Sequence, residues 1–244
     1  MSRYGLIGKT LNYSFSKEFF SKKFEKEERD DTYENIELES PEALAQYLKN
    51  NKNDFKGFNV TSPYKEAVIP LLDRVNKEAK IIGAVNTIKV TPTKKLVGYN
   101  TDVYGFALTL SDFLPIKERT ALILGTGGAS KAIAQVLKTM DFDYKFVSRK
   151  GSDDIYSYQD LTDDVIKQHY LIINCTPLGT YPNVLVYPKI PYMSITKDHV
   201  LIDLIYNPSQ TEFLKRGFTQ GARVCNGLKM LNLQAKKSWS IWQK

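Results

Sequence analysis

The chain has 244 residues, 42% of them hydrophobic and 25% charged, a make-up typical of a globular protein with one large α/β domain or two small ones. Its net charge is +7, but the lysines are scattered, and the densest cluster, residues 22–29, alternates in sign as a solvated helix face does. Polynucleotide binding is disfavoured, because it needs a basic stripe interleaved with aromatic residues.

The N-terminal stretch MSRYGLIGKT lacks the apolar core and cleavage site of a signal peptide, and no apolar run approaches the roughly 18 residues that a membrane span needs. We therefore expect a cytoplasmic protein without a membrane partner. Cys175 and Cys225 each end a predicted buried strand, so we interpret them as small core residues rather than a disulfide or metal pair. No cluster of His, Cys and carboxylates predicts a metal site.

Along the first part of the chain, strand and helix patterns alternate. Strands are predicted at 4–8, 32–38 and 55–61, helices at 15–24 and 40–48, and a hairpin of two short strands at 84–90 and 94–100. Because the hairpin is antiparallel, this region is expected to form a mixed sheet.

After a predicted helix at 102–114 the pattern changes to bare apolar strands separated by helices, which indicates a parallel sheet. The strands are predicted at 120–125, 144–149, 171–176 and 199–206, and helices at 125–140 and 227–239. We predict an α/β protein of two domains. Residues 1–101 form a substrate-binding and catalytic domain onto which the C-terminal segment 227–244 packs back, and residues 102–226 form a Rossmann-type nucleotide-binding domain.

A lysine stands at an unusual position in the segment NVTSPYK. Ser62 and Pro63 are typical of a helix start, which places Lys65 in the first turn, where the helix dipole disfavours a cation. A lysine in such a place can release its proton and act as an acid and base. The two histidines, His169 and His199, lie beside predicted core strands and are poorer candidates.

Asp102 lies at the start of the predicted helix 102–114. An isolated aspartate in this position is typical of a helix cap. Paired with Lys65, it would instead position the ammonium group and balance its charge. Both interpretations of Asp102 stand at this point.

A glycine turn, GTGGAS, follows the strand at 120–125 and opens a helix, which is the setting of a dinucleotide-binding fingerprint. Glycines allow close approach of a pyrophosphate, and the helix N-terminus offers free amides. It is not a phosphate-binding loop of the Walker type, because Ser130 and Ala132 stand where that motif has glycine and a hydroxyl residue. The alternative is a tight turn that binds no ligand.

Two cationic residues lie at the end of the strand predicted at 144–149. Where an NAD enzyme commonly has an acidic residue for the ribose hydroxyls, this chain has Ser148, Arg149 and Lys150. Two cations and a hydroxyl suit a 2′-phosphate, so we predict NADP(H) rather than NAD(H). The alternative is a solvated basic loop.

Taken together, these motifs resemble the shikimate dehydrogenase family over nearly the whole chain. The segments that carry the resemblance are NYSFSK, NVTSPYK, GAVNTI, NTDVYG, GTGGAS, SRK, NCTPLG, LIDLIYNPSQT and NGLKMLNLQA. The resemblance implies NADP-dependent reduction of 3-dehydroshikimate to shikimate, in the biosynthesis of chorismate and the aromatic amino acids. It also implies an active-site cleft between the two domains.

The resemblance further implies individual roles. Lys65 and Asp102 would be the catalytic pair. The substrate would be bound by Ser14, Ser16, Thr61, Lys65, Asn86, Asp102, Tyr206 and Gln234. The cofactor would be bound by Gly125, Thr126, Gly127, Gly128, Ala129, Ser148, Arg149, Lys150, Thr176, Leu204 and Gly227.

Each lesser residue also has a plain structural explanation. Ser14 and Ser16 could cap a helix, Asn86 could hold a turn, Tyr206 could lie in the core, and Gln234 could be a solvated helix position. The chain also departs from common family residues at Tyr13, Lys17, Ser148, Lys150, Thr180 and Lys229.

Other functions stay open on the sequence alone. They are a quinate or dual-specificity dehydrogenase, a folate-linked methylene dehydrogenase of similar layout, and a non-catalytic NADP-binding sensor. The expected partner is a small-molecule substrate, and the chain is expected to be a monomer or a homodimer.

Overall fold

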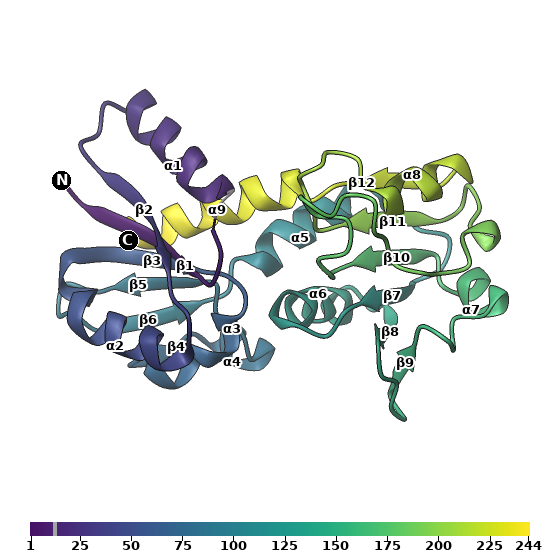
Figure 1. The fold of residues 1–244 in the computed structure, drawn as a ribbon, viewed down its shortest axis with the longest axis horizontal. Coiled ribbons are helices and arrows are strands. Elements are labelled where there is room, and N and C mark those ends of the chain that lie inside the picture. Colours follow the sequence, from purple (N-terminus) through teal and green to yellow (C-terminus); the bar gives the residue numbers. More distant parts are fainter. Residues whose placement is uncertain (12–13) are drawn as a thin grey trace. The chain divides into compact units, whose positions relative to one another are not determined.

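The computed structural model describes residues 1–11 and 14–244; Asn12 and Tyr13 of the segment NYSFSK lie outside the described residues. The chain divides into two compact units (Figure 1). Unit 1 comprises Met1–Asp102 and Asn232–Lys244, and unit 2 comprises Val103–Leu231. The first division falls next to the predicted domain boundary, whereas the second falls inside the last helix rather than before it.

Unit 1 contains a mixed six-stranded sheet in the order β2-β1-β3-β5-β6-β4. Its strands are β1 (Arg3–Gly8), β2 (Thr32–Glu37), β3 (Phe55–Val60), β4 (Arg74–Val75), β5 (Thr87–Val90) and β6 (Leu96–Tyr99). β1 lies parallel to β2 and β3, and β5 lies antiparallel to β3 and β6. The predicted hairpin is therefore present, with shorter strands than expected.

Helices cover both faces of this sheet. The helices of unit 1 are α1 (Phe15–Lys26), α2 (Pro41–Asn51), α3 (Tyr64–Ala67) and α4 (Lys77–Ile82), with single 3₁₀ turns at Lys52–Asp54 and Ile69–Leu71. Leu44 and Leu48 of α2 pack with the strands in one core, while Phe20 and Phe24 of α1 pack in another with the end of α9 (Leu228–Trp242). Each apolar face of the sheet is thus removed from water.

The end of α9 lies directly on the sheet of unit 1. Trp242 Nε1 donates to the carbonyl of Ile88 at 2.9 Å. A Cβ at Gly57 would lie 2.1 Å from Trp242 Nε1, so only glycine permits this close approach.

The helix start predicted at Ser62 is wrong. α3 begins at Tyr64 with Pro63 as its cap residue and no side-chain cap hydrogen bond, and it ends at Ala67. A helix this short has only a weak dipole, since the macrodipole sums over aligned peptide units. The surroundings of Lys65 are therefore set by its side-chain contacts.

Unit 2 contains a six-stranded parallel sheet in the order β12-β11-β10-β7-β8-β9. Its strands are β7 (Thr120–Leu124), β8 (Asp143–Ser148), β9 (Ile155–Ser157), β10 (Leu171–Asn174), β11 (Val200–Asp203) and β12 (Arg223–Cys225). Read from β9 and numbered within the unit, this is the order 3-2-1-4-5-6 of the dinucleotide-binding fold. The order reverses between β7 and β10, where such folds bind their ligand.

The helices of unit 2 also lie on both faces of its sheet. They are α5 (Asp102–Ser111), which begins at the last residue of unit 1, α6 (Gly128–Thr139), α7 (Asp163–Gln168) and α8 (Glu212–Thr219), with a 3₁₀ turn at Tyr192–Ser194. Ile123 of β7 packs with α5 and α6, and its neighbour Leu122 packs with α7 and α8. Successive strand residues point to opposite faces, so a strand buried on both sides has no polar alternation.

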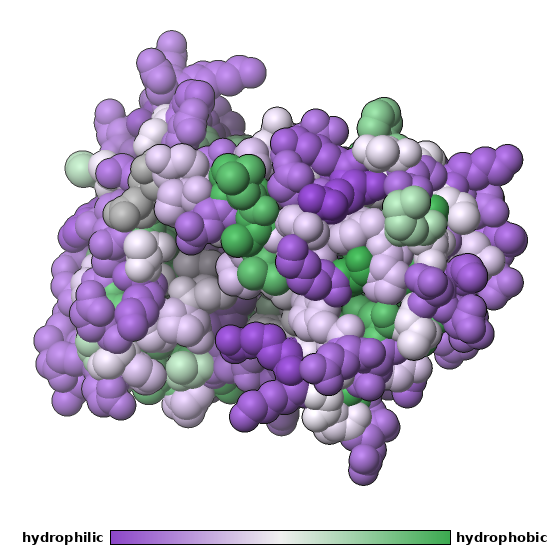
Figure 2. Space-filling view, turned by 45° about the vertical axis from the view of Figure 1, so that its right-hand side comes forward, coloured by the Kyte–Doolittle hydropathy of each residue, from purple (hydrophilic) through white to green (hydrophobic). Residues whose placement is uncertain are grey.

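The remaining features of the surface and core are ordinary. Hydrophilic side chains predominate on the face shown in Figure 2, where hydrophobic ones form small patches. None of the described helices is long and apolar enough to cross a membrane. Cys175 and Cys225 are not joined in a disulfide and lie half-buried against the core of unit 2. His199 is buried, and its Nδ1 accepts from the Thr196 amide.

Candidate active site

Lys65 and Asp102 form an ion pair in unit 1. Lys65 Nζ lies 2.7 Å from Asp102 Oδ2, and the two side chains are 14% and 7% exposed. The other carboxylate oxygen accepts from Asn86 Nδ2 at 2.8 Å. Since both oxygens of Asp102 are engaged in this way, its carboxylate positions the lysine rather than capping α5.

The sheet of unit 1 explains why these residues meet. β1, β3 and β6 end at the same edge at which β5 begins, because β5 is the antiparallel strand between β3 and β6. Thr61 and Lys65 follow β3, Asn86 precedes β5, and Asp102 follows β6. Three segments that are separate in sequence therefore bring their polar side chains to one edge.

Asn86 is the centre of a buried hydrogen-bond network. It is 3% exposed, and besides Asp102 it contacts Thr101, whose backbone N–H donates to Asn86 Oδ1 at 2.7 Å. The Thr101 hydroxyl lies 3.3 Å from Gln234 Oε1 of α9. Gln234 is buried, so it is not the solvated helix position that its sequence allowed.

The serine pair divides into two environments. Ser14 caps α1, because its Oγ accepts from the Lys17 amide at 3.2 Å, and it is half-buried. Ser16 is buried and interacts with the Tyr33 side chain. Capping thus accounts for Ser14 and leaves its predicted contact with substrate untested.

The residues predicted to bind the cofactor gather at one edge of the sheet in unit 2. All strands of this sheet are parallel, so their carboxyl ends share an edge. The glycine turn follows β7, Ser148 ends β8, Thr176 follows β10, Leu204 follows β11, and Gly227 follows β12. The Gly125 amide donates to the Val147 carbonyl at 2.7 Å, which fixes the turn against the end of β8.

The glycine turn leaves backbone exposed. Gly125 has φ +109°, a conformation that favours glycine. A Cβ at Gly127 would meet no atom within 4 Å, so there is open space in front of the turn, and no side chain caps α6. Thr126 is exposed, while Gly128 and Ala129 are half-buried. The first amides of α6 are therefore available to an anion.

Arg149 and Lys150 are exposed, and no ion pair of either is found among the residues that the structure describes. The Lys150 amide donates to Ser148 Oγ at 3.2 Å, and the same hydroxyl contacts the Lys150 carbonyl. Ser148 therefore shapes the loop, and the two cations remain open to a ligand.

Asp203, at the end of β11, is a functional candidate that the sequence analysis did not identify. It is fully buried and accepts from Asn174 Nδ2 at 3.0 Å, the Ile205 amide at 3.0 Å and the Thr211 hydroxyl at 2.6 Å. Burial raises the pKa of Asp203 to about 6. An aspartate that ends an otherwise apolar strand, VLID, was the available signal.

These contacts hold the loops that carry Thr176 and Tyr206. Asn174 Oδ1 accepts from the Thr176 hydroxyl at 2.6 Å, while Tyr206 is half-buried just past Ile205. A Cβ at Gly227 would lie 2.1 Å from the Leu204 carbonyl oxygen, so close backbone packing explains this glycine.

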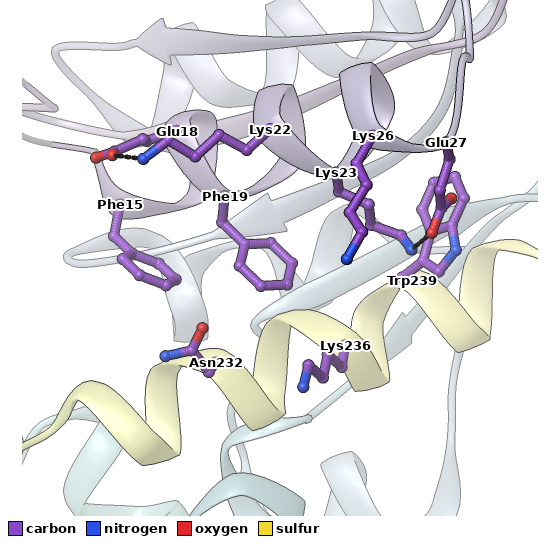
Figure 3. A pocket seen from close by; sticks show the side chains of 10 residues that line it. All are labelled: Phe15, Glu18, Phe19, Lys22, Lys23, Lys26, Glu27, Asn232, Lys236 and Trp239. Carbon is purple, nitrogen blue, oxygen red and sulfur yellow. Dashed lines mark hydrogen bonds and ion pairs between the residues drawn. The ribbon is translucent and has the colours of Figure 1, made fainter.

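A groove on unit 1 is lined by none of the predicted site residues. It has a volume of about 610 Å³, and Figure 3 shows Phe15 and Phe19 of α1 directed toward α9. It is lined by Phe15, Glu18, Phe19, Lys22, Lys23, Lys26, Glu27, Asn232, Lys236 and Trp239. Two of its lysines already pair with Glu18 and Glu27. Neither Lys65 nor any of its hydrogen-bond partners lines the groove.

Metal ligands do not gather anywhere in residues 1–11 and 14–244, where no group of three or more His, Cys, Asp or Glu side chains could hold an ion.

Known proteins resemble this chain both in sequence and in structure. Residues 6–88 match the family model described as the shikimate dehydrogenase substrate binding domain. A shikimate dehydrogenase (NADP(+)) of Clostridium beijerinckii is 40% identical, over 100% of this chain and 93% of that protein.

Solved structures agree with the sequence comparison. A shikimate 5-dehydrogenase of Thermus thermophilus, in complex with NADP(H) and shikimate, is 30% identical with a TM-score of 0.87 and covers 99% of this chain and 93% of its own. A quinate dehydrogenase of Corynebacterium glutamicum, in complex with NAD, is 28% identical with a TM-score of 0.87 over the same shares of the two chains. The chain therefore belongs to the shikimate dehydrogenase family, as the motifs in its sequence predicted.

Proposed function

We propose that the chain catalyses the reversible, NADP-dependent reduction of 3-dehydroshikimate to shikimate, a step toward chorismate and the aromatic amino acids. The observation that carries this proposal is the buried Lys65–Asp102 ion pair of 2.7 Å, present in a chain of the shikimate dehydrogenase family. An ammonium group fixed by a carboxylate can stabilise a developing alkoxide and give it a proton.

The proton moves between Lys65 and the oxygen of the substrate. In the direction of reduction, Lys65 Nζ donates a proton to the former ketone oxygen and becomes a neutral amine, while Asp102 stays a carboxylate and holds Nζ in place. In the direction of oxidation, the neutral amine of Lys65 takes the hydroxyl proton. NADPH, when bound, supplies the hydride for the ketone carbon.

The edge of the sheet in unit 2 fits NADP. Open space in front of Gly127 and the uncapped N-terminus of α6 suit a pyrophosphate. Arg149 and Lys150 are free to hold a 2′-phosphate, and an arginine can do so with two parallel hydrogen bonds. We infer that Thr126, Gly128, Ala129, Thr176, Leu204 and Gly227 complete this site.

Substrate-binding roles follow from the family. We infer that Ser14 and Ser16 hold the ring carboxylate, and that Thr61, Asn86, Gln234 and Tyr206 bind other groups of the ring. The cytoplasmic location and the state of monomer or homodimer stay predictions.

The proposal is tested by absorbance at the reduced-nicotinamide band, with purified protein and each pairing of shikimate or quinate with NADP or NAD. We expect rapid reduction of NADP with shikimate. Binding of NADP without turnover of either ring acid would contradict the proposal and support a non-catalytic sensor.

A second candidate is a quinate or dual-specificity dehydrogenase. The structural similarity to the quinate dehydrogenase that was solved with NAD favours keeping this substrate in the assay. A larger kcat/KM for quinate than for shikimate would assign the chain to that activity instead.

A further inference from the structure

Asn59 occupies a central place in unit 1 although the proposed mechanism does not use it. It lies on β3 and pairs in register with Thr87 of β5, so the two side chains project from the same face of the sheet. That face is covered by α1 and the end of α9. Asn59 is 4% exposed and Thr87 is fully buried.

Every polar atom of the Asn59 side chain has a partner. Its Oδ1 accepts from the Tyr33 hydroxyl at 2.8 Å. Its Nδ2 lies 3.0 Å from Ser238 Oγ of α9 and 3.2 Å from both the Asn86 carbonyl and Thr87 Oγ1. A buried amide so fully engaged has a single favourable orientation, because any rotation would leave a donor unsatisfied.

The bonds from Asn59 lead to the catalytic pair. The Thr87 hydroxyl lies 3.0 Å from Asn86 Oδ1, and Ser238 Oγ lies 2.8 Å from Thr87 Oγ1 and 3.2 Å from Thr101 Oγ1. Asn86 in turn donates to the carboxylate of Asp102. Rotation of the Asn86 side chain is therefore opposed by groups that Asn59 holds.

In the other direction Asn59 connects to Tyr33, which interacts with Ser16. The Tyr33 hydroxyl donates to Asn59 Oδ1 at 2.8 Å, and Ser16 interacts with the same hydroxyl. Ser16, Tyr33, Asn59 and Asn86 are all buried. These contacts link the residue inferred to hold the substrate carboxylate to the residues proposed to act on the ring ketone.

We propose that Asn59 is a positioning residue that, with Ser238, sets the orientation of Asn86 and thereby of Asp102 and Lys65. The proposal rests on the dehydrogenase activity proposed above. Asn59 contacts neither substrate nor cofactor. It acts by fixing the distance and orientation between the residues that hold the ring carboxylate and the residues that transfer the proton. Small displacements of such residues strongly lower the rate.

The test compares Asn59→Ala, Ser238→Ala and the double variant in the oxidation of shikimate by NADP. We expect kcat to fall roughly 10-fold or more in Asn59→Ala and about 3-fold in Ser238→Ala, with KM for shikimate changed less than kcat. The Kd for NADP should stay unchanged. The double variant should be about as slow as Asn59→Ala, because the two residues act through one network.

Thr109→Val is the matched control. It removes a buried hydroxyl that bonds only the Gly105 carbonyl, at 2.8 Å, so it should lower stability and leave kcat unchanged. Wild-type kcat in folded Asn59→Ala, or losses that simply multiply in the double variant, would overturn the positioning role. If Asn59→Ala does not fold, a wild-type kcat in Ser238→Ala would overturn it. An inactive wild-type protein would instead overturn the dehydrogenase proposal.

Discussion

Two buried aspartates, one in each unit, are held in contrasting ways. Asp102 of unit 1 pairs with the cation of Lys65 at 2.7 Å. In the part of the chain that the structure describes, the donors to Asp203 of unit 2 are all uncharged, those of Asn174, Ile205 and Thr211. Desolvation of a carboxylate favours its neutral form and raises the pKa of Asp203. The first arrangement suits proton chemistry, and the second suits the tying together of loops.

The sites that surround the two aspartates also differ in how their residues are held. In unit 1 the site is a network of buried side chains that bond one another, so each group has a fixed position. In unit 2 the predicted cofactor site consists of backbone at strand ends and of exposed cations. Substitutions in the buried network of unit 1 should therefore act mainly on turnover, and those at the strand ends of unit 2 mainly on affinity and stability.

Removal of the lysine should have the largest effect. In Lys65→Ala, kcat should fall by about 10²–10⁴-fold, the usual contribution of general acid–base catalysis. The fold should be intact and the Kd for NADP, measured by fluorescence, should match that of the wild type. A variant that also lost affinity for NADP would contradict the proposal that unit 1 carries out proton transfer and unit 2 binds the cofactor.

The buried Asp203 of unit 2 should make the stability of the protein depend on pH. The pKa of Asp203 is raised from 3.8 to about 6 in the folded state, so the folded protein takes up a proton before the unfolded chain does. Stability from this group therefore rises as pH falls from about 6 toward 4.

Asp203→Asn imitates the neutral acid at every pH and is the reference. Between pH 7 and pH 4, the free energy of unfolding of the wild type relative to this variant should rise by about 2–3 kcal/mol, as the pKa shift implies. Urea titrations of both proteins would measure it. A difference that does not change with pH would contradict the description of Asp203 as an unpaired buried acid.

Arg149 and Lys150, which follow β8, should affect only the affinity for NADP. In Arg149→Ala, KM for NADP should rise roughly 10–100-fold, the equivalent of one or two charge-assisted hydrogen bonds, while kcat and KM for NAD stay unchanged. Arg119→Ala removes an exposed arginine next to the beginning of β7, at the opposite edge of the sheet, and should change neither. Equal effects of the two variants would refute a 2′-phosphate site at Arg149.

Substitution of Ser14 should have the smallest effect. It separates two roles of this residue, because loss of a helix cap lowers stability whereas loss of a substrate contact raises KM. Ser14 and Ser40 cap α1 and α2 with the same 3.2 Å bond to a backbone amide. Ser14→Ala and Ser40→Ala should each cost about 1 kcal/mol of stability. Only Ser14→Ala should also raise KM for shikimate, by roughly 10-fold. An unchanged KM in Ser14→Ala would leave capping as its whole role.

Local patterns in the sequence predicted the two units well. Apolar strands, helices such as the one predicted at 40–48 and the glycine turn at 125–128 are encoded by residues close together in the chain. The helix start at Ser62 was wrong because a short loop after β3 overrides the capping preference of serine and proline. Lys65 nevertheless lies in the first turn of α3, as the sequence predicted, because the helix begins only at Tyr64.

The network around the catalytic pair was beyond sequence reasoning. Asn59 and Thr87 come from two strands, Thr101 from the loop between β6 and α5, and Ser238 from α9. Each alone is an unremarkable polar residue. Their bonds exist only because the antiparallel strand β5 and the returning helix bring them to one face. The family resemblance supplied Asn86 and Gln234, whose positions no local pattern would have indicated.

The central claim is that Lys65 transfers a proton, and Lys65→Arg tests it most directly. Arginine keeps the positive charge beside Asp102 but does not give up its proton near neutral pH. The rate of NADP reduction with saturating shikimate should therefore fall by at least about 100-fold, as expected for loss of a general acid–base group. Turnover near that of the wild type would show that this position supplies charge alone, and would contradict the mechanism.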